Sequence, residues 1–380
     1  MKRTISLLLV FVSCFPAIIR SQPANYHPID AKATKETRAL YRNLFSLLEK
    51  GVMFGHQDAL AYGVNWRYEP GRSDVKEVVG QYPAVYGWEV GHIELDSPQN
   101  LDQVPFDQMR SFIRTGYEKG GVITISWHLN NPLNEKKAWD VMPGSVTSVL
   151  PGGSKHEVFK VYLDRLARFL GSLRAKNGTP VPVLFRPFHE LTGDWFWWGQ
   201  TLCTAEEFKQ LWRFTVNYLK EEKQLHHILY VYNTDKFYSK EHFLERYPGD
   251  AYVDVVSFDT YYFTDSLPTR KQEYIDNITN RMRWMSEVAK EHNKLPAFAE
   301  TGYEAIPQAD WWTAVLLPLL KQHPVSYVLV WRNQGLMKES GKMHYYAPYP
   351  GHGSAADFLK FSKDPHMLFE KRTKAFRVYK

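Results

Sequence analysis

The chain has 380 residues, of which 44% are hydrophobic and 23% are charged, and its formal net charge is +6 at pH 7. This is an ordinary globular composition with enough apolar residues for a large core. The sequence has no basic run, phosphate-binding loop or dinucleotide-binding glycine pattern, which excludes nucleic acid and a nucleotide cofactor as expected partners.

The first residues have the features of an export signal. Lys2 and Arg3 precede an apolar run, Ile5–Phe15, that is too short to span a membrane as a helix. We therefore predict a signal peptide over residues 1–22 and an exported protein, either periplasmic or extracellular. The segment FVSC, which ends at Cys14, faintly resembles a lipoprotein motif, so a lipid anchor at Cys14 is the less favoured alternative. We predict no membrane-spanning segment.

Eight short runs of apolar, β-branched or aromatic residues follow along the chain, and each predicts a β-strand. The runs are continuous rather than alternating, which is typical of strands buried on both faces of a parallel sheet. The predicted strands are Val52–Gln57, Ala84–Gly91, Val122–Leu129, Pro182–Glu190, His227–Asn233, Asp254–Tyr262, Pro296–Gly302 and Ser326–Asn333.

Segments with helical spacing lie between several of these strands. Apolar residues recur there at intervals of three and four, which predicts amphipathic helices over Phe106–Gly120, Val158–Gly178, Glu206–Glu222 and Gln272–Asn293. Eight strands that alternate with helices predict the α/β class and a (β/α)8 TIM barrel. A doubly wound open sheet is the alternative, and the polar residues at the strand ends argue against it.

Polar or aromatic residues end every predicted strand. The carboxyl ends of the strands in such a barrel share one face, where active sites are built, so we expect these ends to converge on one pocket. The end residues are His56 and Gln57, Glu89 and His92, Trp127 and His128, His189 and Glu190, Asn233, Asp259 and Tyr261, Glu300, and Trp331 and Arg332.

Two of the end residues are glutamates that would face each other across the barrel mouth. Glu190 ends the fourth predicted strand and Glu300 ends the seventh. A carboxylate after an apolar run is costly unless it is paired or used in chemistry. Two carboxylates across a cleft lined with aromatic rings fit glycoside hydrolysis. Taken singly, each glutamate could also be an ordinary ion-pair residue.

Four segments resemble motifs of glycoside hydrolase family 26, the family of many β-mannanases, whose barrels carry catalytic glutamates on strands four and seven. RPFHELTGDWFWWG (Arg186–Gly199) is similar to the acid/base motif, and FAETGYE (Phe298–Glu304) is similar to the nucleophile segment. SFDTYY (Ser257–Tyr262) and VLVWRN (Val328–Asn333) resemble the motifs of the sixth and eighth strands.

The resemblance implies a retaining double-displacement hydrolysis, with Glu190 as the general acid/base and Glu300 as the nucleophile. Their carboxyl groups should then lie about 5–5.5 Å apart. The implied activity is that of a mannan endo-1,4-β-mannosidase acting on mannan, glucomannan or galactomannan and on manno-oligosaccharides. Residues 23–380 would form a single catalytic domain. The mechanism requires no metal and no cofactor, and we predict neither.

Residues around the two glutamates have implied roles as well. Trp195 is a candidate for the wall that buries Glu190, and burial would raise the pKa of that acid. Tyr261 matches a tyrosine that orients the nucleophile. His189 would hydrogen-bond near the nucleophile or the sugar at the cleavage point, with a core histidine as the alternative. Arg186 would form a salt bridge below the site, although a purely structural role is equally credible.

The resemblance places sugar contacts further along the cleft. Trp331 should be the stacking platform of the −1 sugar, and His128 should lie in the negative subsites. Arg332 should reach the −2 sugar, with a pairing to Glu300 or Asp259 as the alternative. Trp139 could be another contact, and the long loop over residues 130–157 should border the negative subsites.

Other functions remain open from the sequence. A β-1,3-xylanase or a mixed-linkage β-glucanase of the same family is the nearest enzyme alternative. A glycan-binding protein without catalysis is an alternative of a different class, and the presence of both Glu190 and Glu300 argues against it.

Overall fold

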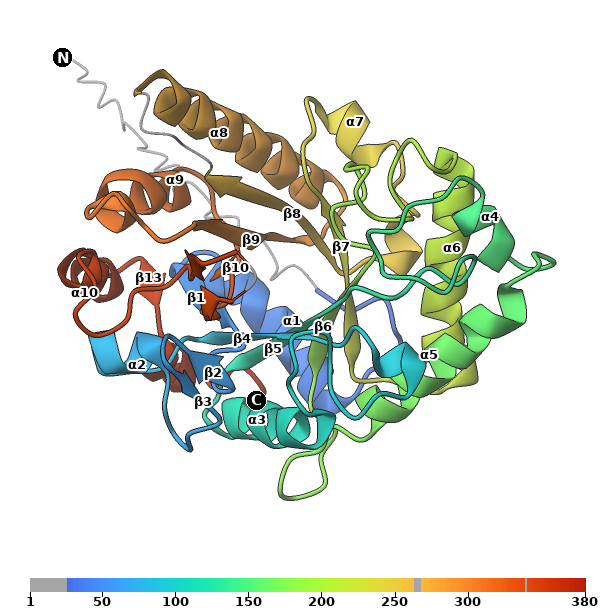
Figure 1. The fold of residues 1–380 in the computed structure, drawn as a ribbon, viewed down its shortest axis with the longest axis horizontal. Coiled ribbons are helices and arrows are strands. Elements are labelled where there is room, and N and C mark those ends of the chain that lie inside the picture. The colour runs from blue at the N-terminus through green and yellow to red at the C-terminus, as the bar shows by residue number, and fades with distance from the viewer. Residues whose placement is uncertain (1–25, 263–267, 339) are drawn as a thin grey trace, which may run out of the picture.

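Eight parallel strands close into a barrel, which the computed structural model describes for residues 26–262, 268–338 and 340–380 (Figure 1). The barrel strands are β1 (Val52–Gln57), β4 (Val85–Glu89), β5 (Val122–Trp127), β6 (Val183–Pro187), β7 (Ile228–Thr234), β8 (Val255–Tyr262), β9 (Leu295–Tyr303) and β10 (Tyr327–Val330). Met53 of β1 pairs with Tyr327 of β10, and this pairing closes the sheet. The predicted TIM barrel is therefore confirmed, and the open sheet is wrong.

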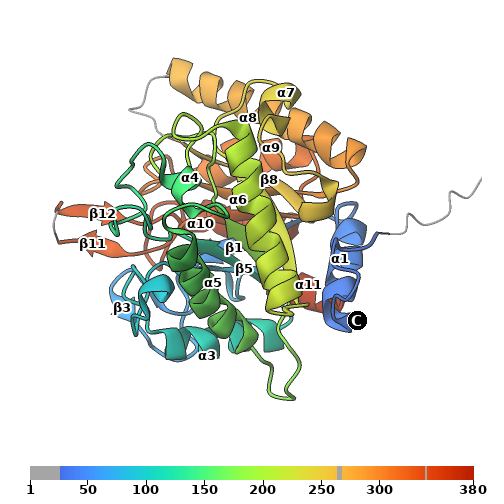
Figure 2. The ribbon, with the colours of Figure 1, turned by 90° about the vertical axis from the view of Figure 1, so that its right-hand side faces the viewer.

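Helices surround the barrel (Figures 1 and 2). They are α1 (Lys35–Leu47), α2 (Asp74–Val79), α3 (Phe106–Glu118), α4 (Ser145–Val149), α5 (His156–Gly171), α6 (Ala205–Asn217), α7 (Lys240–Leu244), α8 (Pro268–Glu291), α9 (Leu317–Gln322), α10 (Ala355–Lys363) and α11 (Glu370–Ala375). The four predicted helices correspond to α3, α5, α6 and α8. The prediction for α5 ran seven residues too far, because Arg174 and Pro180 form a β-bridge around a turn at Gly178.

The helix α1 closes the amino-terminal end of the barrel. Thr34 caps its first turn by accepting a hydrogen bond from the Thr37 N–H at 3.2 Å. Leu40, Tyr41 and Leu44 are buried against apolar side chains at the beginnings of the barrel strands. Since this face of α1 lies against the barrel, its opposite face is exposed.

Two small hairpins stand at the other end of the barrel. One is formed by β2 (Tyr62–Gly63) and β3 (Trp66–Arg67), and the other by β11 (Gly335–Met337) and β12 (Lys342–His344). A short strand, β13 (Met367–Leu368), pairs with the start of β1. Figure 2 shows α1 and the carboxyl terminus on one side of the molecule and the β11–β12 hairpin on the opposite side.

Several barrel strands end earlier than the sequence predicts. The predicted fourth strand runs to Glu190, whereas β6 ends at Pro187, because Phe188 and Glu190 have φ angles of 48° and 53° that cannot continue a strand. His128 follows the end of β5, and Arg332 lies two residues beyond β10. The polar residues at these strand ends therefore belong to the loops of the barrel mouth.

The predicted signal peptide, residues 1–22, and the possible anchor at Cys14 lie outside the described residues. Within the part that is described, no helix combines the length and the apolar character that crossing a bilayer requires.

Candidate active site

A β-bulge places two acidic residues side by side on neighbouring strands. Phe258 of β8 is opposite Phe298 of β9, but the next residue, Asp259, is opposite Glu300 because Ala299 is an extra residue in the register. Bulges change the direction in which the following side chains point. Asp259 and Glu300 therefore face the same buried group.

That group is the guanidinium of Arg186, on β6. It forms ion pairs with Glu300 Oε1 and Asp259 Oδ2, and all three side chains are nearly inaccessible to solvent. Tyr261 donates a hydrogen bond from its hydroxyl to Glu300 Oε2 at 2.8 Å. Both oxygens of Glu300 therefore have a fixed partner, which holds its carboxylate in one orientation. The predicted salt bridge of Arg186 is present, and it includes Glu300 itself.

Glu190 lies on the loop that follows β6. Its backbone N–H donates to Asn233 Oδ1 at 2.8 Å, and Asn233 in turn donates to Asp259 Oδ1 at 2.8 Å. This amide links the Glu190 backbone to the Arg186 ion-pair cluster. Glu190 has a φ of 53°, which is unfavourable for a residue other than glycine. The hydrogen bond from its backbone to Asn233 helps to maintain this strained conformation.

The carboxyl of Glu190 favours the protonated form. Burial raises its pKa well above the ordinary value, and the nearby charges of Asp259 and Glu300 raise it further. Trp195 acts in the opposite direction, because its indole N–H donates to Glu190 Oε2 at 2.7 Å and so favours the charged form. Trp195 is 40% exposed and contacts the acid through the polar edge of its ring, so this hydrogen bond partly offsets the effect of burial.

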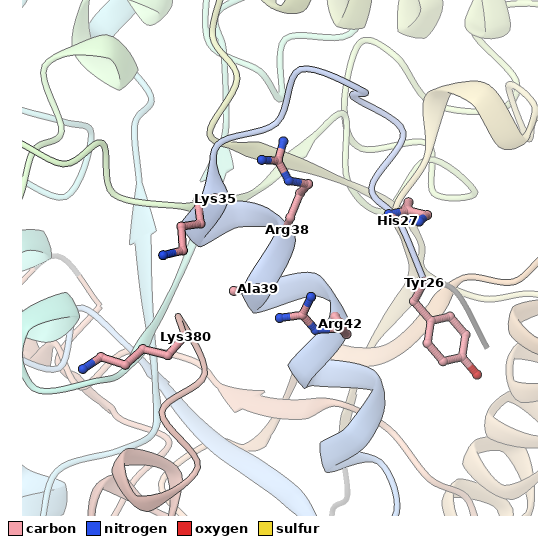
Figure 3. A pocket seen from close by; sticks show the side chains of 7 residues that line it. All are labelled: Tyr26, His27, Lys35, Arg38, Ala39, Arg42 and Lys380. Carbon is pink, nitrogen blue, oxygen red and sulfur yellow. The ribbon is translucent and has the colours of Figure 1, made fainter. Parts of the chain in front are cut away.

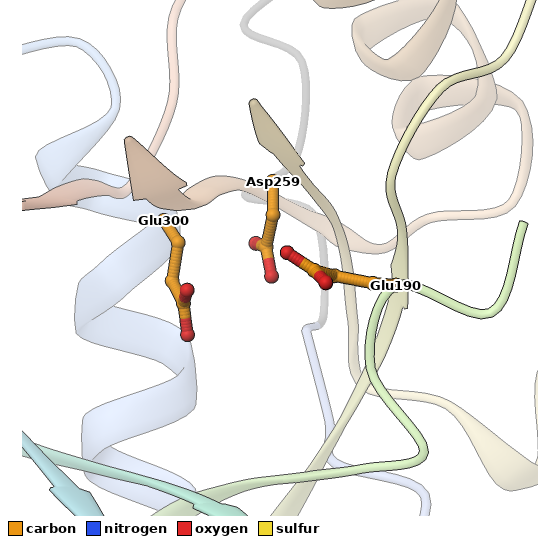
Figure 4. A group of neighbouring side chains, drawn as sticks. All are labelled: Glu190, Asp259 and Glu300. Atoms are coloured by element: carbon orange, nitrogen blue, oxygen red, sulfur yellow. The ribbon is translucent and has the colours of Figure 1, made fainter. Parts of the chain in front are cut away.

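Glu190, Asp259 and Glu300 converge at the barrel mouth (Figure 4). One carboxylate oxygen from each lies within 4.8 Å of the others. A retaining glycosidase holds its two carboxyl groups about 5–5.5 Å apart, and an inverting one about 6.5–9.5 Å apart. An oxygen of Glu190 and an oxygen of Glu300 within 4.8 Å of each other are closer than an inverting pair requires and are compatible with a retaining pair. Asp259 and Glu300 already share a cationic partner, the guanidinium of Arg186.

Glu190 and Glu300 line a cleft with a volume of about 250 Å³. The side chains that line it are His128, Trp139, His189, Glu190, Trp195, Phe196, Tyr261, Glu300, Trp331, His344 and Tyr346. Five of the six predicted substrate-binding residues, together with Trp139, are among them. The loop over residues 130–157 reaches the cleft through Trp139, whose ring stacks on His128 with a centroid distance of 5.0 Å.

Sequence reasoning missed three residues of the cleft. Phe196 lies within the recognised motif, but His344 and Tyr346 follow the last predicted strand and carry no motif of their own. Gly302 accommodates Tyr346, because a Cβ at Gly302 would lie 2.3 Å from the tyrosine ring. In the sequence, the glycine at position 302, two residues after Glu300, was the feature that could have indicated a close contact with another side chain.

The sequence and structure comparisons agree with this site. Residues 29–313 match the family model of glycosyl hydrolase family 26. This chain is a member of glycosyl hydrolase family 26. The resemblance inferred from the four motifs is therefore confirmed.

Curated relatives of this family 26 chain include two mannan endo-1,4-beta-mannosidases. The one from Bifidobacterium adolescentis is 30% identical over 350 residues, which are 88% of this chain and 34% of that protein. The one from Bacillus subtilis strain 168 is 25% identical over 349 residues, covering 88% of this chain and 90% of that protein. The chain thus spans about a third of the first relative and most of the second.

Solved structures of the family share the fold. A GH26 β-mannanase from Bacteroides ovatus is 44% identical with a TM-score of 0.86, and the match covers 91% of this chain and 98% of that one. A modular endo-β-1,4-mannanase from Cellulomonas fimi is 33% identical with a TM-score of 0.79, over 91% of this chain and 78% of that one.

A buried acid fixes the two histidines of this family 26 cleft. Glu89 accepts a hydrogen bond from the His128 backbone N–H at 2.8 Å and lies 2.7 Å from His128 Nδ1. Burial opposes ionisation of Glu89, but its contacts to His128 and Ser126 hold its pKa below the ordinary value. The Glu89 carboxylate therefore accepts a hydrogen bond from His128 Nδ1–H.

His189 forms a hydrogen bond with His128, because the two Nε2 atoms are 3.0 Å apart. Burial, with further contributions from His128 and Arg186, lowers the pKa of His189 well below its ordinary value. His189 is therefore neutral, and its Nδ1 has no hydrogen-bond partner among the described residues. His189 lines the cleft, as expected of a residue near the nucleophile or the sugar, and its partner in the structure is His128.

Arg332 has a different partner from those considered in the sequence. It forms an ion pair with Asp102, rather than with Glu300 or Asp259. Only 3% of the Asp102 side chain is exposed, so the pair is buried beside the cleft. Trp331 lines the cleft, whereas the side chain of the next residue, Arg332, pairs with Asp102 and is not part of that lining.

Proposed function

We propose that this protein is an exported, retaining endo-β-1,4-mannanase, with residues 23–380 as its catalytic domain, acting on mannan, glucomannan or galactomannan. The separation of Glu190 and Glu300 within 4.8 Å is the observation that supports a retaining hydrolysis most directly. The mannanase names of its relatives support the choice of substrate. The charged leader, with Lys2 and Arg3 before an apolar run, supports export.

The first half of the reaction forms a glycosyl ester on Glu300. Arg186 and Tyr261 orient the Glu300 carboxylate, so that it can attack the anomeric carbon from one fixed direction. Glu190 is held protonated by burial and neighbouring negative charge, and it donates its proton to the leaving oxygen. The Trp195 indole fixes the orientation of that acid and becomes a stronger partner as Glu190 loses its proton.

The second half releases the sugar with retained configuration. When Glu300 has become an ester, its negative charge no longer opposes ionisation of Glu190. Glu190 can then accept a proton from the incoming water, which attacks the same carbon from the face that the leaving group vacated. Arg186 and Tyr261 stabilise the Glu300 carboxylate, which is the leaving group of this step.

The sugar contacts follow from the lining of the cleft. Trp331 offers an aromatic face for the −1 sugar, and Trp195 has an exposed ring on the leaving-group side next to Glu190. Glu89 holds His128 in one orientation and His128 contacts His189, so that the two rings present fixed polar edges to hydroxyl groups. Such an arrangement binds a sugar without a loss of side-chain freedom.

Product analysis tests the proposed substrate. Purified protein should cleave mannohexaose and galactomannan, and NMR should show that the first product has the β configuration, because two displacements retain it. β-1,3-Xylan and mixed-linkage β-glucan serve as parallel substrates. Faster cleavage of either one, or an α-configured first product, would contradict the proposal. Binding of mannohexaose with no hydrolysis of any of them would favour the glycan-binding alternative.

Replacement of Arg332 tests its proposed contact with the −2 sugar. Arg332→Ala is expected to lower kcat/KM on mannotetraose, because a charge-assisted hydrogen bond remote from the reacting carbon is lost. The loss should correspond to an increase of about 1–3 kcal/mol in the activation free energy. The substitution should have little effect on an aryl monomannoside, and Arg332→Lys should not restore the loss, since a point charge cannot form the forked contact.

The ion pair with Asp102 requires a control for stability. Arg332→Ala leaves a buried carboxylate unpaired and should lower the free energy of unfolding by about 3–5 kcal/mol. The double variant Arg332→Met/Asp102→Leu should recover that stability without recovering kcat/KM on mannotetraose. If activity returned together with stability, Arg332 would act only as a structural partner of Asp102.

A further inference from the structure

The exposed face of α1 carries a cavity that the catalytic cleft does not reach. Its volume is about 280 Å³, and Figure 3 shows the residues around it. They are Tyr26, His27, Lys35, Arg38, Ala39, Arg42 and Lys380. The cavity lies at the amino-terminal end of the barrel, since the other face of the same helix seals that end.

Four cationic side chains line this cavity. Lys35, Arg38 and Arg42 are exposed and follow one another at intervals of three and four, so they share one face of the helix. Lys380 is held next to α1, because its backbone oxygen accepts a hydrogen bond from Asn43 at 3.0 Å. Across the described residues, no acidic side chain lines the cavity and none of the four forms an ion pair. Like charges on one surface repel one another, and a bound anion would relieve this repulsion.

The aromatic neighbour of these cations is also exposed in part. Tyr26 stacks on Phe45 of α1 with a centroid distance of 3.6 Å and an interplanar angle of 6°. An aromatic ring beside basic side chains is a combination that suits the interface between a membrane and water.

We propose that the basic face of α1 (Lys35, Arg38 and Arg42, with Lys380) binds the anionic headgroups of a membrane surface. Basic side chains near an anionic leaflet each raise the partition coefficient about fivefold, and tyrosine is enriched at the same interface. The loops of the cleft stand at the opposite end of the barrel from α1 (Figure 2). Docked in this way, the enzyme directs its cleft away from the membrane and toward the polysaccharide.

Vesicle flotation with the full chain tests the proposal. The variant Arg38→Glu/Arg42→Glu is compared with Lys209→Glu/Lys360→Glu, which changes the net charge equally on α6 and α10 and also involves cations without an ion pair in the described part. Each protein is mixed with vesicles of phosphatidylglycerol and phosphatidylcholine, or of phosphatidylcholine alone. All carry the same residues 1–25, so the leader contributes equally throughout.

The expected result is a loss of at least about 30-fold in binding to anionic vesicles for the α1 variant, relative to wild type, because two basic side chains are lost and two acidic ones are added; the control should change little. Binding of wild type to anionic vesicles should exceed that to neutral ones and weaken with added salt. Both variants should hydrolyse an aryl mannoside at the wild-type rate, which verifies that they are folded.

Three outcomes would overturn the proposal. Equal ratios of anionic to neutral binding in the two variants would show that α1 does not recognise headgroups. Stabilisation of wild type by inorganic phosphate, lost in the α1 variant and without preference for anionic vesicles, would indicate a site for a small anion. Sedimentation of wild type as a dimer and of the α1 variant as a monomer would indicate a second copy of the chain.

Discussion

Glu300→Gln is expected to lower kcat on mannan by about four orders of magnitude or more, because the amide cannot form the glycosyl ester. The change keeps the shape of the side chain, and the amide oxygen can still accept from Arg186. Asp259 remains as the charged partner of the guanidinium, so the fold should persist. Single-turnover kinetics with an activated aryl mannoside measure the first step directly, and thermal unfolding measures stability.

Tyr261→Phe is the matched control for this site. It removes the hydroxyl that donates to Glu300 Oε2 but leaves the nucleophile in place, so the loss in kcat should be far smaller. An activated fluoro-mannoside should form a covalent adduct with Glu300 in the wild type and in Tyr261→Phe. Near-normal activity of a homogeneous Glu300→Gln protein, or an adduct on a different residue, would show that Glu300 is not the nucleophile.

The barrel could be predicted from the sequence because its strands are buried on both faces. Each strand is a short continuous apolar run, and this signal does not depend on distant residues. The ends of the strands were less certain, since the polar residues after β5, β6 and β10 look like strand ends in the sequence. Helices such as α2 and α7 have only six and five residues, which is too short for a helical period to emerge.

The longer helix α1 could have been found. It has a threonine cap at Thr34 and apolar residues at Leu40, Leu44 and Leu47, which is the spacing of a buried helical face. The sequence offered no reason, however, to expect that this face would close the barrel. Such a placement depends on the packing of several distant strands at once.

The candidate site was predictable where its residues are contiguous. Glu190 and Trp195 belong to one recognisable segment, and Tyr261 and Glu300 belong to two others. The partners of Arg332 and His128 carried no such signal, because Asp102 is 230 residues away from the first and Glu89 is 39 residues away from the second. The bulge at Ala299, which brings Asp259 next to Glu300, also has no signature in a single sequence.

Glu190→Ala is expected to reduce turnover of natural mannans far more than that of aryl mannosides with good leaving groups. Only a poor leaving group needs the proton that Glu190 donates, so the first step survives with an activated substrate. The second step then limits the rate, because no base assists water. Azide should accelerate that step, since it needs no base, and the product should be the β-azide. Initial rates on both substrates, with and without azide, measure these effects.

The pH dependence gives an independent check on the same residue. Since burial and the charges of Asp259 and Glu300 raise the pKa of Glu190, the acid remains protonated above the ordinary range of a glutamate, and kcat/KM of the wild type should fall as pH rises through the raised value. This alkaline limb should disappear in Glu190→Ala on an activated substrate.

The stability of the wild type should depend on pH in the same direction as its activity. Glu190 stays protonated in the folded chain at pH values where, in the unfolded chain, it has already lost its proton, near the ordinary pKa of about 4.3. The free energy of unfolding of the wild type should therefore decline as pH rises from that value through the raised pKa, and Glu190→Gln should remove this part of the decline. Equal losses on natural and activated substrates, with an unchanged alkaline limb, would mean that Glu190 supports the loop after β6 and is not the proton donor.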